Sequence, residues 1–325
     1  YALTDNYICG NFNLQQGGGV AHLGLSDGGL IARNTIIFNE SYNQTQTVSG
    51  GGLLIAGEPV LVGQALSPGA GNVTVDGNLI LGNAADAGNG GGVALLRVNG
   101  QDAADDEVDD YAVTLTNNKL YNNLAGLAGG GLSIADAVNV TARHNTIARN
   151  DSTATAGAAV SAGTVEDGQS WSLAQSGAGI AFYPTSPDLV AVAGPGVPVL
   201  EDNIVWQNRQ FVFTSTGFTV DPNGDGVYGL CPDLNGVGVD CQNAPAPFDG
   251  TAAVYDNLAV VDDPPGTLAC TSCFTDDTGD PAFVSDYFTE GRNPWVGQPE
   301  QQTIATPAVL DEAGNFVRVD RKSTR

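Results

Sequence analysis

Two short patterns of apolar and polar positions alternate along the first 260 residues. In the first pattern, an asparagine is followed two residues later by an aliphatic residue and five residues later by a second asparagine. The leading asparagines are Asn6, Asn34, Asn78, Asn118, Asn145 and Asn203, and a weakened copy surrounds Asn257. A small or apolar residue stands three positions before each leading asparagine, as Val75 stands before Asn78. In three copies another apolar residue stands two positions further back. This period of two predicts short strands with one buried face.

The second pattern is a glycine-rich entry followed by alternating apolar residues. Its copies lie at 17–20, 50–55, 90–95, 129–134 and 177–182. The spacing from this pattern to the next leading asparagine is short in two copies and longer by about one loop in three. The inserted segments are predicted at 56–70, 97–110, 151–176 and 183–198. A repeat with a fixed core and loops inserted at fixed corners is typical of a solenoid.

These patterns predict an all-β fold, a right-handed parallel β-helix with about six to seven coils over residues 1–260. Strands of one coil would bond to those of the next, and apolar side chains would stack inside. Glycine permits a positive φ at the corners, and asparagine also tolerates a left-handed conformation. The six leading asparagines would then stack as a ladder. Residues 261–325 carry few marks of the repeat and are predicted to form an irregular cap or tail.

The asparagine corner and the Gly-Gly-Gly-aliphatic entry resemble the right-handed parallel β-helix repeat proteins of bacterial cell surfaces, within the pectate-lyase-like superfamily. The resemblance covers about residues 1–260. It implies the fold and a cell-surface or extracellular location. It does not imply one activity, because lyases, hydrolases, epimerases, adhesins and passive scaffolds share this fold.

The charge balance narrows the range of partners. The formal net charge is −25, with 11 Lys and Arg residues in 325. Binding to phosphate backbones needs clustered basic residues, so the composition argues against a nucleic-acid partner. No run of 18 apolar residues occurs, and we therefore predict no membrane span.

Four of the five cysteines fall in two close pairs, Cys231 with Cys241 and Cys270 with Cys273, and Cys9 stands alone. The second pair has the Cys-x-x-Cys spacing of redox motifs, without the βαβ context of such motifs. We predict two local disulfides, which imply an oxidising setting outside the cytoplasm.

Residues 221–233 are rich in oxygen ligands on a tight turn, which is the requirement of a calcium loop. The candidate Ca²⁺ ligands are Asp221, Asn223, Asp225, the Val227 carbonyl and Asp233. Gly226 stands at the sixth place, where the turn needs glycine. Pro232 occupies the place of the usual bidentate acid, so the motif is partial.

This segment also resembles the loops of thrombospondin type 3 repeats, which carry a cysteine just before their last acid. Cys231 fits that cysteine, but Asp233 lies one place late for the acid. A plain Asp/Gly turn stapled by a disulfide explains the same residues equally well.

Candidate catalytic groups stand just before the leading asparagines. In aligned coils, Arg143 lies one coil from Glu201, and His144 lies one coil from Asp202. Neighbouring strands are about 4.8 Å apart, so both pairs are expected to touch. A carboxylate beside His or Arg can do general acid/base chemistry. Surface salt bridges between coils are commoner, and we favour that interpretation.

The sequence therefore favours an extracellular, non-enzymatic β-helix that serves as a scaffold, an adhesin or an assembly subunit. Its partners would be further copies of itself, another cell-surface protein or a polysaccharide. One alternative is a lyase or hydrolase of acidic polysaccharides that uses the four paired residues. A second alternative is a calcium-dependent carbohydrate-binding module that uses the 221–233 loop.

Overall fold

The structure, a computed structural model, describes residues 1–43, 45–104, 110–161, 164–166, 169–173, 175–219, 226–232, 255–261, 266–279 and 281–283. The 221–233 loop therefore falls largely outside the described residues, apart from 226–232. Cys241 also lies outside them, so the predicted pairing with Cys231 stays a prediction.

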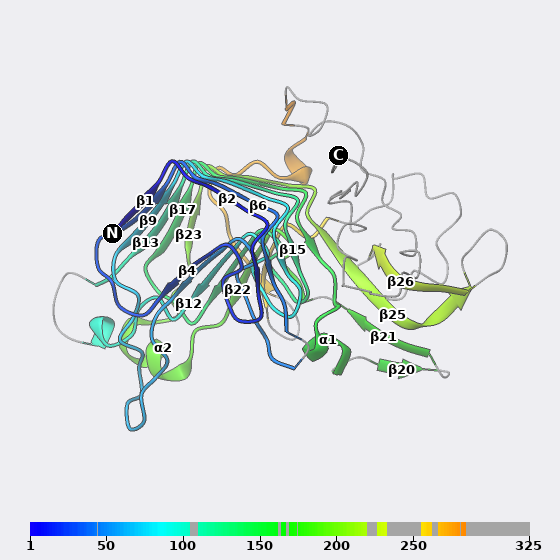
Figure 1. Ribbon diagram of the computed structural model, residues 1–325, viewed down its shortest axis with the longest axis horizontal. Coiled ribbons are helices and arrows are strands. Elements are labelled where there is room, and N and C mark those ends of the chain that lie inside the picture. Colours follow the sequence, from blue (N-terminus) through cyan, green and yellow to red (C-terminus); the bar gives the residue numbers. More distant parts are fainter. Residues whose placement is uncertain are drawn as a thin grey trace.

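The described chain winds into a parallel β-helix in which each coil passes through four sheets in turn (Figure 1). The first sheet contains β1 (Ala2–Thr4), β5 (Gly29–Ala32), β9 (Val73–Asp76), β13 (Val113–Thr116), β17 (Val140–Arg143) and β23 (Val199–Glu201). The second contains β2 (Tyr7–Cys9), β6 (Thr35–Ile37), β10 (Leu79–Leu81), β14 (Lys119–Tyr121), β18 (Thr146–Ala148) and β24 (Ile204–Trp206). Both sheets are parallel throughout, and this confirms the prediction of an all-β, parallel β-helix.

The third sheet begins as a parallel stack and then leaves the solenoid. Its stacked strands are β3 (Phe12–Asn13), β7 (Glu40–Ser41), β11 (Ala84–Ala85), β15 (Leu124–Ala125), β19 (Asp151–Ser152) and β25 (Arg209–Thr219). The long strand β25 then pairs antiparallel with β21 (Gln169–Leu173) and β26 (Gly226–Pro232), and β21 pairs with β20 (Thr164–Glu166). These strands project from one side of the coils in Figure 1.

The fourth sheet carries the strands that follow the glycine-rich entries. They are β4 (Val20–Leu23), β8 (Leu53–Ala56), β12 (Val93–Leu96), β16 (Leu132–Ala135), β22 (Ile180–Tyr183) and β27 (Leu258–Val260), with β28 (Gly266–Thr267) antiparallel at the end. Short helices lie in the connections: η1 (Asp102–Ala104), α1 (Gly157–Ser161), α2 (Pro187–Ala193) and η3 (Asp276–Thr278).

The core is a stack of equivalent apolar side chains inside the coils. Ile36 pairs with Ile80, which pairs in turn with Leu120, and each of the three is at most 1% exposed. Val73, Val75 and their equivalents in neighbouring coils stack in the same way. Burial of each such side chain stabilises the fold by about 1.5–3 kcal/mol, so the repeat supplies its own driving force.

The glycine-rich entry is required by the closeness of successive coils. A Cβ atom on Gly51 would lie 2.3 Å from the Ala84 carbonyl oxygen, and one on Gly91 would lie 2.1 Å from that of Leu124. No real Cβ tolerates such a contact with backbone. The second and third glycines of this motif therefore permit coil stacking.

The left-handed residue at each corner is the one before the asparagine, and not the asparagine itself as the sequence had suggested. Before the leading asparagines, φ is positive at Asp5, Arg33, Gly77, Asn117, His144 and Asp202. The same is true before the second asparagines, at Gly10, Phe38, Gly82, Asn122, Arg149 and Gln207. This conformation turns the chain and leaves the following asparagine side chain facing the next coil.

Asn257 occupies a different corner from the one predicted for it. It accepts hydrogen bonds from Asn208, the second asparagine of its motif, and it precedes β27 of the fourth sheet. The weakened copy is therefore aligned with the second asparagine and not with the leading one. The misalignment arose because both corners use the same residue type.

Candidate functional site: the asparagine corners and the disulfide

The leading asparagines form a continuous hydrogen-bonded ladder along one corner. The backbone N–H and the Nδ2 of Asn78 both donate to Oδ1 of Asn118, at 3.0 and 2.9 Å. Nδ2 of Asn78 also donates to the Ile31 carbonyl oxygen of the preceding coil, at 2.9 Å. The same pattern runs from Asn6 to Asn203. We call these six residues the first ladder.

A second ladder, which the sequence did not predict, runs along the next corner. It consists of Asn11, Asn39, Asn83, Asn123, Asn150, Asn208 and Asn257. Asn39, Asn83, Asn123, Asn150 and Asn208 are buried. The signal was present as the second asparagine of each motif copy. Both ladders point the same way, with amide donors directed toward the next coil and acceptors toward the previous one.

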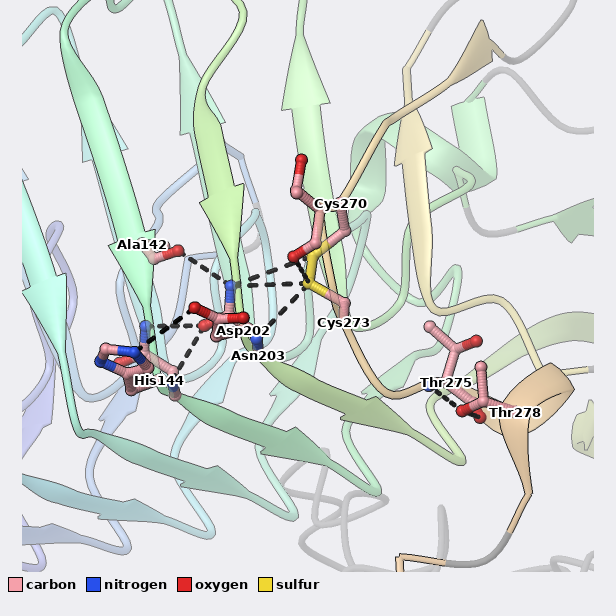
Figure 2. Close-up of a disulfide and its surroundings, with 10 residues drawn as sticks. Ala142, His144, Asp202, Asn203, Cys270, Cys273, Thr275 and Thr278 are labelled. Carbon is pink, nitrogen blue, oxygen red and sulfur yellow. Dashed lines mark hydrogen bonds and ion pairs between the residues drawn. A yellow bond between two sulfur atoms is a disulfide. The ribbon is translucent and has the colours of Figure 1, made fainter.

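The predicted catalytic residues meet on the outer side of the first corner. Nε of Arg143 lies 2.8 Å from Oε2 of Glu201, and Nε2 of His144 lies 3.5 Å from Oδ2 of Asp202. Figure 2 shows His144 beside Asp202, and each directly follows one of two adjacent strands, β17 and β23. The side chains are 46% and 36% exposed in the first pair and 58% and 53% in the second. Both pairs lie in solvent, where such contacts contribute little stability.

The corner conformation explains why His144 and Asp202 stand where they do. Their φ angles are 54° and 51°, in the left-handed region. Asp, Asn and His are the non-glycine residues that adopt this region most readily. A backbone requirement therefore accounts for these residue types without any catalytic role.

Substitutions of His144 distinguish the backbone requirement at this position from the contact with Asp202. We expect His144→Asn, which keeps a residue tolerant of positive φ, to change the free energy of unfolding by less than about 0.5 kcal/mol. We expect His144→Val to cost about 1–2 kcal/mol, because a β-branched residue is strained at φ 54°. Urea denaturation of the two variants measures the difference. Equal losses in both would show that the ion pair, and not the backbone, decides this position.

Other carboxylates on the same corner are held in the ionised state by their hydrogen-bond donors. The Thr116 hydroxyl, 2.6 Å away, and Nδ2 of Asn117, 3.0 Å away, lower the pKa of Asp76. The bidentate contact with Arg33 lowers the pKa of Asp5. Both groups therefore act as acceptors between coils, and neither is suited to donate a proton near neutral pH.

The Cys270–Cys273 disulfide is formed, as predicted, and it closes the first ladder (Figure 2). Residue 271 pairs with Glu201 and Phe274 pairs with Ile204, so Cys273 takes the register of a ladder asparagine below Asn203. The backbone N–H of Asn203 points at Sγ of Cys273, 3.4 Å away. The second ladder ends on Oδ2 of Asp276, which accepts from Nδ2 of Asn257 at 2.5 Å.

Within the described residues, no group of three or more His, Cys, Asp or Glu side chains is placed to hold a metal ion. Of the predicted calcium ligands, Val227 lies in β26, while Asp221, Asn223, Asp225 and Asp233 lie outside the described part of the chain. No described helix is both long and apolar enough to cross a membrane.

Comparison of the chain with protein-family models, with curated proteins and with solved structures finds no match.

Proposed function

We propose that this protein is an extracellular, non-enzymatic scaffold or assembly subunit built on a rigid stack of coils. The observation that carries the proposal is the pair of uninterrupted ladders. The two ladders and the stacked core together hold each coil in register with the next. Most of the polar groups at the corners bond between coils. Such a rod is suited to holding surfaces at a fixed distance.

The first coil presents a surface that the inner coils bury. The interior residues Leu3, Ile8 and Val20 are partly exposed, whereas their equivalents Ile31 and Ile36 are fully buried. Outward-facing apolar side chains are also exposed there, namely Tyr7, Phe12, Leu14 and Leu23. Strand edges that carry apolar side chains readily pair with another chain.

The ladders add polarity to this surface. Among the described residues, Oδ1 of Asn6 and Oδ1 of Asn11 accept no hydrogen bond, although the equivalent atom of every inner ladder asparagine accepts two. A further coil, of this chain or of another copy, that brings amide donors to both corners would complete the pattern.

The setting of the protein is also a proposal. The formal net charge of −25 favours solubility, and the disulfide fits an oxidising compartment outside the cytoplasm. A right-handed coil of the kind found in bacterial surface proteins is favoured, because crossovers between parallel strands are almost always right-handed.

Cys9 offers a direct test, because it is a free, exposed cysteine on β2 of the first coil. We expect the unmodified protein to sediment faster as its concentration rises. A bulky maleimide adduct at Cys9 should abolish this dependence, while the small carbamidomethyl adduct should preserve it. Sedimentation velocity measures both. A monomer at all concentrations, or equal association with either adduct, would contradict assembly through this coil.

A further inference from the structure

The junction between Asn203 and the disulfide differs from every other junction of the first ladder. At the inner junctions, the backbone N–H and Nδ2 of an asparagine both reach an amide oxygen at about 3.0 Å, as Asn145 does at 2.9 and 3.0 Å on Asn203. At the last junction, the N–H of Asn203 lies 3.4 Å from Sγ of Cys273. Nδ2 of Asn203 lies 3.9 Å from both sulfur atoms.

The sulfur atoms are therefore in the place of an oxygen acceptor. A disulfide sulfur accepts hydrogen bonds weakly, whereas a thiolate is charged and accepts them strongly. Two amide donors that are fixed by the rest of the ladder would favour the thiolate form of Cys273. Because Asn203 is held by bonds to Asn145 and to the Ala142 carbonyl oxygen, these donors need no rearrangement.

Three carboxylates lie near this junction. Glu201 is paired with Arg143, and Asp202 lies 3.5 Å from His144, whose ring is charged only when it is protonated. Asp276 accepts from the N–H of Gln207 and from Nδ2 of Asn257. In the reduced state, a neutral Cys273 thiol could donate to the Thr271 carbonyl oxygen, 3.6 Å away, which is a long contact. The backbone N–H and Nδ2 of Asn203 are the donors that favour the thiolate of Cys273 over the thiol.

We propose that Cys270–Cys273 is a redox-active disulfide that exchanges with thiols, and not an inert staple. A thiolate of a dithiol substrate attacks Sγ of Cys270, so that the bond between the two cysteines breaks. Cys273 leaves as a thiolate bound by Asn203. The second substrate thiol, after losing its proton, attacks the mixed disulfide and releases Cys270, which takes up a proton.

In the complete exchange, the dithiol is oxidised to a disulfide and the protein disulfide is reduced by the same two electrons. Both cysteine residues are partly exposed, and Cys270 also packs against the apolar core. Stabilisation of the leaving thiolate both speeds the exchange and favours the reduced protein, which makes the disulfide an oxidant of dithiols.

The test follows the pH dependence of Cys273 alkylation in the reduced protein, resolved by peptide mass spectrometry. We expect the rate in the folded protein to reach half its maximum at least one pH unit below the value for the same cysteine in urea. A midpoint in the folded protein equal to or above that in urea would overturn the proposal.

A matched pair of variants assigns the cause. Asn203→Asp keeps the acceptor that Asn145 uses and replaces the amide donor near the sulfur atoms by a carboxylate. It should move the midpoint back toward the value in urea. Asn78→Asp makes the same change three coils away in the same ladder, where it does not contact Asn203, and should leave the midpoint unchanged. A midpoint that responds equally to both variants, or to neither, would contradict the assigned role of Asn203. The wild-type comparison decides the proposal if a variant fails to fold.

Discussion

Arg209→Ala is expected to lower the free energy of unfolding by about 3–5 kcal/mol, because it leaves a buried carboxylate without its counter-charge. The Arg209 and Asp151 side chains are 2% and 0% exposed. Nε and Nη2 of Arg209 donate to the two oxygens of Asp151, at 3.0 and 2.8 Å. Chemical denaturation at neutral pH measures the loss.

The chain offers a matched control for this prediction. Arg33 makes the same bidentate contact with Asp5, at 2.9 and 2.7 Å, but both side chains are more than half exposed. Arg33→Ala should therefore cost much less, because water and salt screen the pair. Asp151→Leu combined with Arg209→Met should recover most of the loss. A loss for Arg209→Ala no larger than for Arg33→Ala would show that the buried pair does not have the stated role.

Asn123→Ala is expected to cost about 3–6 kcal/mol, because the amide satisfies buried partners on both sides. Its Oδ1 accepts from the N–H and Nδ2 of Asn83, each at 3.0 Å. Its Nδ2 donates to the Ile80 carbonyl oxygen and to Oδ1 of Asn150, each at 3.0 Å. Each buried polar group that loses its partner costs about 1–3 kcal/mol, and the gap left by the side chain lets some of them relax.

Asn11→Ala is the control for the ladder, because Asn11 has the same role at an exposed position. Its Nδ2 donates to Oδ1 of Asn39 at 2.8 Å, and water can replace that bond. We expect less than a third of the loss seen for Asn123→Ala in the same urea titration. Similar losses at the two positions would contradict the view that the ladder stabilises the fold through buried hydrogen bonds.

The fold was predictable because the copies of the repeat share the same apolar positions and the same corner residues. A period of two on either side of an asparagine corner, together with Gly-Gly-Gly entries, leaves a stacked coil as the arrangement that buries every apolar position. The pairing of Arg143 with Glu201 followed from the same alignment. The disulfide of Cys270 and Cys273 followed from their spacing.

Other features needed the backbone path. Asp151 and Arg209 each follow a second-ladder asparagine, so alignment of the coils places them side by side, but sequence alone does not show that this position is buried. The displacement of Asn257 to the second ladder depended on the long excursion of β25 and β26 out of the solenoid. The sequence did not indicate that Cys273 lies below Asn203, because the last coil carries no leading asparagine.

Negative-stain electron microscopy of the native extracellular material tests the central claim, that the protein is an assembling scaffold, most directly. We expect regular assemblies of rods, which a bulky adduct at Cys9 disperses. Dispersed single particles in the unmodified material would contradict it.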